Sequence, residues 1–227
     1  MKYSNATLAK VSRVALVGLA CGCLALAVTP FAASDNKEAD QFRKEGENAR
    51  KAIEDVRDQL QNTLEAYDMM FAATDKKLQS SHKKLASAVE KTEKTVASGR
   101  KDVATFQETA KTFFVLWEQS VASISTASIQ EASQKRLEAA RIAFAGMDEN
   151  LSAAKKAYEP FIGSLKEQVA LTSQDLSPAT VALLKEDVAP ELHAKADEVF
   201  AALEDLLTKE KANEDEVNQI LDEEGGE

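Results

Sequence analysis

Apolar residues recur at intervals of three and four along most of this chain, the spacing that lets an α-helix bury one face. The first stripe ends before Thr74 and Asp75, where its phase slips, and both residue types favour helix caps. We therefore predict a helix boundary there. Upstream, Phe42 stands alone among polar residues, so we predict that residues 35–48 are helical but weakly held. The first stripe consists of Ile53, Val56, Leu60, Leu64, Tyr67 and Phe71.

The second stripe is the longest and repeats every seven residues over about six heptads. At about 1.5 Å per residue, a helix of about 50 residues is a rod of roughly 75 Å. A compact globule of this mass has no room for such a rod, so the molecule should be elongated. One set of stripe positions is Leu78, Leu85, Thr92, Gly99, Phe106 and Phe113, and the other is His82, Val89, Val96, Val103, Ala110, Trp117 and Ile124.

The third stripe follows a polar break, where residues 128–131 fit a capping box that would start a helix. Pro160 lies inside this stripe, which keeps its phase, so we predict a kink and not an end. The members of the stripe are Leu137, Ala140, Phe144, Met147, Leu151, Ala154, Tyr158, Phe161 and Leu165.

The fourth stripe begins after Ser177, a good cap, and Pro178, which suits the first helical position. Pro190 predicts a second kink. The stripe itself is formed by Val181, Leu184, Val188, Leu192, Val199, Leu203 and Leu206.

These four stripes predict an all-α protein, an elongated antiparallel coiled-coil-like bundle of about four long helices after an N-terminal signal segment. We divide the chain into a signal peptide or N-terminal anchor at 1–34, the helical bundle at 35–208 and an acidic C-terminal tail at 209–227. The tail should be a solvated, frayed end. Self-association is plausible, because burial of the stripes only narrowly outweighs the entropic cost of ordering the chain.

Residues 1–34 have the composition of an export signal. Lys2, Lys10 and Arg13 precede an apolar run over residues 14–28, and small residues precede Asp35. This pattern favours cleavage before Asp35 and an exported, periplasmic protein of a Gram-negative envelope.

Two alternatives for this segment stay open. Cys21 or Cys23 would carry lipid if either were a lipobox cysteine, although neither has the expected preceding residues. The run is also about long enough to span a bilayer if it is retained as an anchor. Since both cysteines lie in this segment, a cleaved chain would contain no disulfide.

The chain is acidic, with 28 basic and 38 acidic residues and a net charge of −10. Cleavage before Asp35 would remove three bases and leave a net charge of −13. Such a chain is repelled by nucleic-acid phosphates, so we exclude nucleic acid as a partner. We expect membrane contact only through the N-terminal segment, if it is retained or lipidated.

Residues that carry chemistry are sparse. The two histidines, His82 and His193, lack the Glu-x-x-His spacing of di-iron bundles, because Gln79 and Pro190 stand three residues before them. We interpret His82 as a polar residue that sets helix register. No glycine-rich phosphate loop and no Gly-x-Ser-x-Gly motif occurs. We therefore expect no enzyme activity, no cofactor and no catalytic, cofactor-binding or metal-binding residues.

The densest apolar stretch is "FFVLWEQ", residues 113–119. Phe113 and Trp117 fall on the second stripe, which favours a role as a core anchor, whereas Phe114 lies beside it. Two hypotheses remain for Phe113, Phe114 and Trp117, a core anchor where helices meet or a docking face for a partner.

This stretch, together with "RLEAARIAF" and "YEPFIGSLKEQVALTSQDLSPATVALL", resembles the bacterial domain-of-unknown-function family 2959. The similarity covers most of the chain after Arg50 and is most specific from Pro160 to Leu184. The resemblance implies an exported or lipid-anchored helical protein with no assigned activity. The chain departs from the family in having Ser177 and Pro178 where an Asn-containing turn is expected, and in lacking a lipobox.

The sequence therefore predicts a non-enzymatic cell-envelope protein that acts as a scaffold or spacer through helix–helix contacts, with protein partners or self-association. The alternative is a helical binding module for a peptide, an apolar ligand or a partner helix.

Overall fold

The structure, a computed structural model, describes residues 37–223, and the placement of side chains up to residue 208 except that of Asp75. The expected signal segment 1–34 lies outside this range. The helices, in chain order, are α1 (Lys37–Phe71), α2 (Asp75–Ala122), α3 (Ala127–Gln174), α4 (Pro178–Leu183), the π-helix η2 (Leu184–Val188) and α5 (Ala189–Glu223).

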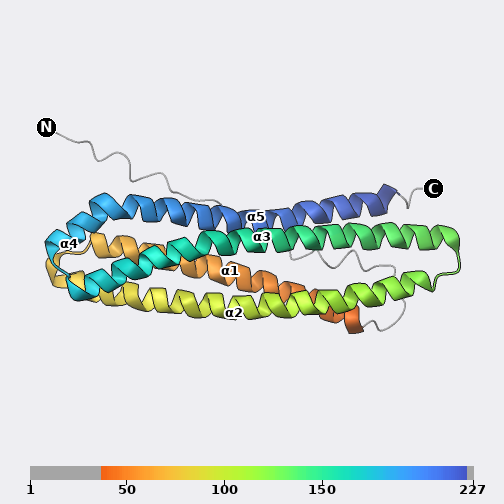
Figure 1. The fold of residues 1–227 in the computed structure, drawn as a ribbon, viewed down its shortest axis with the longest axis horizontal. Helices are drawn as coiled ribbons and strands as arrows, with labels where there is room; N and C mark the ends of the chain where they lie inside the picture. The colour runs from red at the N-terminus through yellow and green to blue at the C-terminus, as the bar shows by residue number, and fades with distance from the viewer. Residues whose placement is uncertain (1–36, 224–227) are drawn as a thin grey trace.

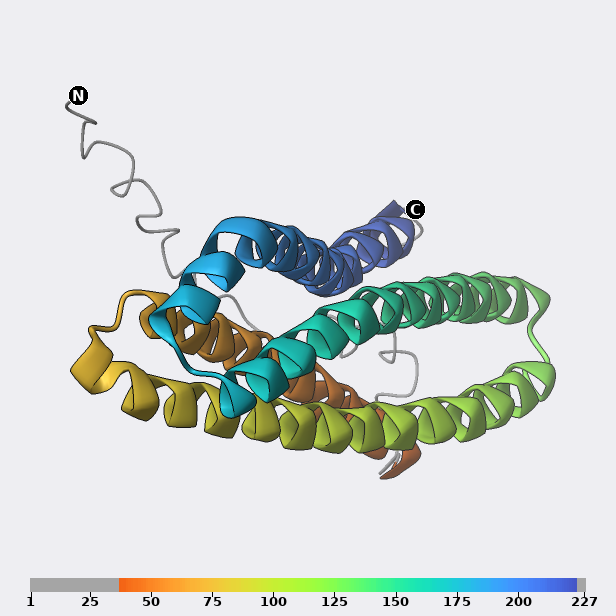
Figure 2. The ribbon, with the colours of Figure 1, turned by 60° about the vertical axis from the view of Figure 1, so that its left-hand side comes forward.

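Four long helices lie side by side and make an elongated all-α bundle (Figure 1). α1 and α5 have 35 residues each and α2 and α3 have 48 each, so the longest helices extend about 72 Å. α1 packs mainly on α2 and α3 mainly on α5, while α1 and α5 meet less closely. Figure 2 shows α4 and η2 curving across one end of the bundle to join α3 to α5. The predicted fold class is confirmed, and the described residues contain no strand.

The helix boundaries fall at residue types that favour caps, although of Thr74, Thr126 and Ser177 only Ser177 caps with its side chain, and one boundary is not where the sequence suggests. α2 begins after Thr74 as predicted, and the Ser177 hydroxyl accepts a hydrogen bond of 3.3 Å from the Thr180 backbone N–H at the start of α4. The predicted capping box at residues 128–131 is wrong. Thr126, with extended backbone, precedes the first helical residue, so Ser128 lies inside the helix.

The two interior prolines have different effects. α3 runs through Pro160 without interruption. Before Pro190 the chain instead forms the π-helix η2, closed by a bond from the Ala189 N–H to the Leu184 carbonyl. Proline has no N–H to donate, and before Pro190 the helix ladder is rearranged into a π turn, unlike at Pro160.

The start of α1 is packed more firmly than its sequence suggests. Phe42 is 3% exposed and stacks on Phe113 of α2, with ring centroids 4.5 Å apart. Ala39 and Ala49 are also buried. The prediction of a weakly held lead-in is therefore wrong, because small residues around a single phenylalanine let α1 lie close to an aromatic stretch of α2.

Buried polar contacts join α1 to both α2 and α3. Between α1 and α2, the hydroxyls of Thr63 and Thr92 are 2.7 Å apart. Between α1 and α3, the Tyr67 hydroxyl donates to the side-chain oxygen of Gln168, whose amide nitrogen is buried without a partner. Burial raises the pKa of Tyr67 well above its usual value. Such contacts favour one alignment of the helices, because a slip would leave buried polar groups unpaired.

The C-terminal helix continues through most of the segment expected to be an acidic tail, since α5 ends at Glu223. Within residues 37–223, no helix is both long and apolar enough to cross a membrane.

Candidate functional site

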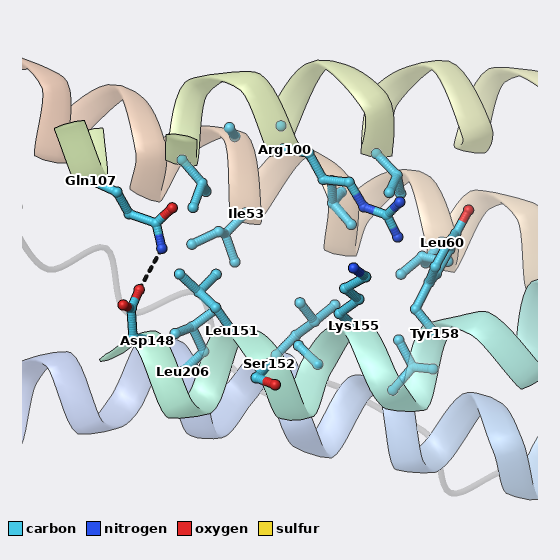
Figure 3. Close-up of a pocket in the computed structure, with 18 residues that line it drawn as sticks. Ile53, Leu60, Arg100, Gln107, Asp148, Leu151, Ser152, Lys155, Tyr158 and Leu206 are labelled. Carbon is cyan, nitrogen blue, oxygen red and sulfur yellow. Dashed lines mark hydrogen bonds between the residues drawn. The ribbon is translucent and has the colours of Figure 1, made fainter. Parts of the chain in front are cut away.

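A central cavity of about 530 Å³ lies between the four long helices near the middle of the bundle (Figure 3). Its walls are mainly aliphatic, and its polar side chains come from α2 and α3. The volume is within the range of about 300–1,000 Å³ that is typical of small-molecule pockets. The central cavity is lined by Ala52, Ile53, Val56 and Leu60 of α1, by Val96, Gly99, Arg100, Val103 and Gln107 of α2, by Asp148, Leu151, Ser152, Ala154, Lys155 and Tyr158 of α3, and by Val199, Leu203 and Leu206 of α5.

Small residues occupy stripe positions along the central cavity. Gly99 faces α1 so closely that an added Cβ would lie 3.4 Å from Val56 Cγ2 and 3.5 Å from the Ala52 carbonyl oxygen. Ala154 occupies the corresponding stripe on α3.

Polar side chains close the two ends of the cavity mouth between α2 and α3. At one end the Gln107 amide donates to the carboxylate of Asp148, and this bond is drawn in Figure 3. At the other end, Arg100 Nη2 forms a 2.7 Å ion pair with Glu159 Oε1. The Arg100 guanidinium also lies 5.8 Å from the centroid of the Tyr158 ring, a cation–π distance.

The charged groups at this second end are Arg100, Glu159 and Lys155. Lys155 is exposed and forms no ion pair or hydrogen bond with any residue whose side chain the structure describes. Figure 3 shows Arg100 and Lys155, from opposite helices, both pointing into the space between α2 and α3. Burial raises the pKa of Tyr158 to about 12, with a further increase from nearby Glu93, so this phenol is neutral at physiological pH.

A second, smaller hollow of about 400 Å³ adjoins the central cavity on the same side. The two hollows share Val96, Arg100 and Tyr158 as lining residues, so the Arg100–Tyr158 pair forms a partition between them. The smaller hollow is lined by more charged residues, including Glu93 and Lys166, which pair with each other at 2.6 Å. The apolar lining is therefore concentrated on the central-cavity side of the Arg100–Tyr158 pair.

The aromatic residues singled out from the sequence lie elsewhere. Phe113, Phe114 and Trp117 are 4%, 7% and 2% exposed and belong to a core cluster in which α1, α2 and α3 meet. Phe114 contacts Phe42 of α1 and Phe144 of α3 edge-on. None of the three lines the central cavity.

The two histidines are apart and have different partners. His82 Nε2 lies 3.3 Å from both the Val169 carbonyl oxygen and the Ser173 hydroxyl, which places this half-buried residue against α3. His193 Nε2 lies 3.0 Å from Asp68 Oδ1. Among the side chains that the structure describes, no group of three or more His, Cys, Asp or Glu residues is placed to hold a metal ion.

Sequence reasoning missed the central cavity, although a signal for it was present. Gly99 was recognised as a stripe position in a row of Leu, Thr and Phe, and a glycine there supplies no side chain to the core. Ala52 of α1 lies against Gly99 and Ala154 of α3 lines the same cavity, but the sequence alone does not show that these helices meet there.

A comparison with protein families matches residues 36–215 to the family described as protein of unknown function (DUF2959). The match covers most of the chain, which therefore belongs to this family, as its resemblance predicted. No curated protein and no solved structure matches the chain significantly.

Proposed function

We propose that this DUF2959 protein is a non-enzymatic helical binding module of the cell envelope, which holds an apolar ligand between its four long helices. The single observation that carries the proposal is the central cavity, which combines a volume of about 530 Å³ with mostly aliphatic walls. The cavity opens to solvent, so its aliphatic walls are in contact with water. An apolar ligand that replaces this water gains packing contacts with the walls.

Three further features support the proposal. The few polar groups at the cavity lie at its mouth, an arrangement suited to orienting a ligand more than to transforming one. Residues 1–34 have the pattern of an export signal, which supports a place in the periplasm, either free or anchored at the N-terminus. The net charge of −10 disfavours nucleic acid as the partner.

The proposal is tested by titrating the purified protein with N-phenyl-1-naphthylamine, a neutral apolar probe that fluoresces when it leaves water. We expect saturable binding of one probe per chain and a rise in melting temperature with probe concentration. Absence of saturable binding to the native monomer would overturn the proposal.

A pair of neighbouring variants locates the probe. Ser152 lines the mouth of the central cavity and is exposed, so Ser152→Phe can fill the mouth without straining the core. Ala153 is equally exposed but does not line the cavity, so Ala153→Phe adds the same side chain outside it. We expect the first variant to weaken probe binding by about tenfold or more and the second to leave it unchanged. Equal effects would place the probe elsewhere.

A second candidate function, a scaffold or spacer, is favoured by the length of α2 and α3 and by large apolar residues that remain exposed. Ile142 of α3 is 74% exposed and Met69 of α1 is 59% exposed. A scaffold should sediment as an elongated oligomer in the absence of ligand. A binding module should be monomeric and gain thermal stability from the probe, so sedimentation and melting curves together separate the two functions.

A further inference from the structure

We propose that the ligand of the central cavity is a single-chain aliphatic carboxylate, with its chain between the four helices and its carboxylate at Lys155 and Arg100. This inference rests on the proposed binding function and adds the chemical class and orientation of the ligand. It follows from the distribution of charge around the cavity.

The interior can accept only an apolar group. Its deeper walls come from aliphatic side chains on all four helices, among them Leu60, Val199 and Leu206, which are at most 3% exposed. A charged group placed there would lose its hydration without a compensating partner. The aliphatic part of any ligand therefore lies inside and its charged part lies at the mouth.

The two ends of the mouth differ in charge. Asp148, at one end, already accepts a hydrogen bond from Gln107. Lys155 is seven residues later on α3, about 10 Å along the helix, and shares its end of the mouth with Arg100. A ligand with one charged group is therefore oriented with that group toward Lys155 and Arg100.

The charge at this end matches a single carboxylate. Glu159, four residues after Lys155, is the acid best placed in sequence to pair with it, but its carboxylate pairs with Arg100. The Lys155 ammonium is thereby left without an ionic partner among the described side chains. One unpaired cation matches one unit of negative charge, and Arg100 has N–H donors beyond the Nη2 group that Glu159 uses.

The net charge of the chain does not oppose this arrangement. Exposed charges farther away than about 8–10 Å are largely screened at physiological ionic strength. The groups at the mouth therefore dominate the interaction with a bound carboxylate.

The experiment compares three probes that share one chain and differ in head group, namely dodecanoate, dodecanol and dodecyltrimethylammonium. Each is titrated into the purified chain by calorimetry at neutral pH, the two ionic probes below their critical micelle concentrations and dodecanol below its solubility limit. We expect dodecanoate to bind most tightly and dodecyltrimethylammonium most weakly. Equal binding of dodecanoate and dodecanol would overturn the inference about the head group while leaving the proposed binding function in place, whereas no binding of any probe would overturn both.

Matched charge variants test the position of the carboxylate. Lys155→Gln removes the cation at the mouth, and Lys156→Gln removes the same charge from the next residue, which does not line the cavity. We expect Lys155→Gln to weaken dodecanoate binding by about fivefold and dodecanol binding by less than about twofold. Lys155→Glu should weaken dodecanoate binding further, and Lys156→Gln should leave both affinities unchanged. Equal losses in the two glutamine variants, or no loss in Lys155→Gln, would overturn the assignment.

Discussion

Phe42 offers the sharpest test of how the bundle is held together, because its importance is visible only in the structure. The residue lies near the start of α1, is 3% exposed and contacts three phenylalanines of α2. We expect Phe42→Ala to destabilise the whole bundle and not only the end of α1. The reason is that removing the ring leaves a cavity against the aromatic stretch of α2.

The magnitude follows from the burial and the ring contacts. Truncation of a buried phenylalanine to alanine typically costs about 3–5 kcal/mol. Phe42 should fall within this range, because it is almost fully buried and its stacking on Phe113 at 4.5 Å adds a favourable aromatic contact. For a chain of this size, each kcal/mol lowers the melting temperature by about 2–4 °C, so the expected decrease is roughly 6–20 °C.

The assay is urea and thermal unfolding, followed by far-ultraviolet circular dichroism and by the fluorescence of Trp117, the single tryptophan. Trp117 lies 5.6 Å from Phe113, so it reports on the same cluster. Ile142→Ala is the matched control, since this aliphatic side chain is 74% exposed and its loss should change stability by less than about 0.5 kcal/mol. A loss below about 1 kcal/mol for Phe42→Ala would refute the packing argument and restore the prediction of a weakly held lead-in.

Three further predictions concern the buried polar contacts. A double-mutant cycle of Thr63→Val and Thr92→Val, measured by urea unfolding, should give a coupling energy of about 0.5–1.5 kcal/mol from their 2.7 Å contact, and additive effects would contradict it. Tyr67→Phe should lower the free energy of unfolding by about 1–3 kcal/mol, because it leaves the Gln168 oxygen unpaired. Adding Gln168→Leu should recover part of that loss. A double variant less stable than Tyr67→Phe would count against this reasoning. Burial raises the pKa of Tyr67, and raises that of Tyr158 to about 12, so the unfolded state loses these phenol protons before the folded state as the pH rises above 10. The contribution of these two phenols to the free energy of unfolding should therefore be intact below pH 10 and decrease toward pH 12. Unfolding curves measured across that range should show a shallower decrease for Tyr67→Phe.

Much of the architecture was predictable because it depends on local spacing. The four stripes indicated four long helices, and the breaks at Thr74 and at Ser177 were found from residues that cap helices wherever they occur. The predicted start of α3 was too late in the chain. Thr126 and Ser128 are both residue types that suit a cap, and Thr126 is the one that precedes the first helical residue. The rearrangement before Pro190 was expected as a kink and is a π-helix.

The candidate site was not predictable in the same way. The residues that line the central cavity come from four helices, and no motif connects them. The cluster that the sequence did single out, Phe113, Phe114 and Trp117, is buried between helices and lies outside the cavity. The burial of Phe42 was underestimated for a related reason. Its aromatic partners follow far later in the chain and are Phe106, Phe113 and Phe114.

By itself, the sequence determined that this protein is built from long amphipathic helices, because the period of an α-helix is set by the backbone and each stripe is complete within one segment. Only the tertiary structure decided where the stripes meet. The central cavity forms because four different helices bring its lining residues together. Arg100 and Lys155 come together at one end of the mouth only because α2 and α3 face each other there. Packing between segments is non-local, so neither the cavity nor its charge can be obtained from the spacing along a single helix.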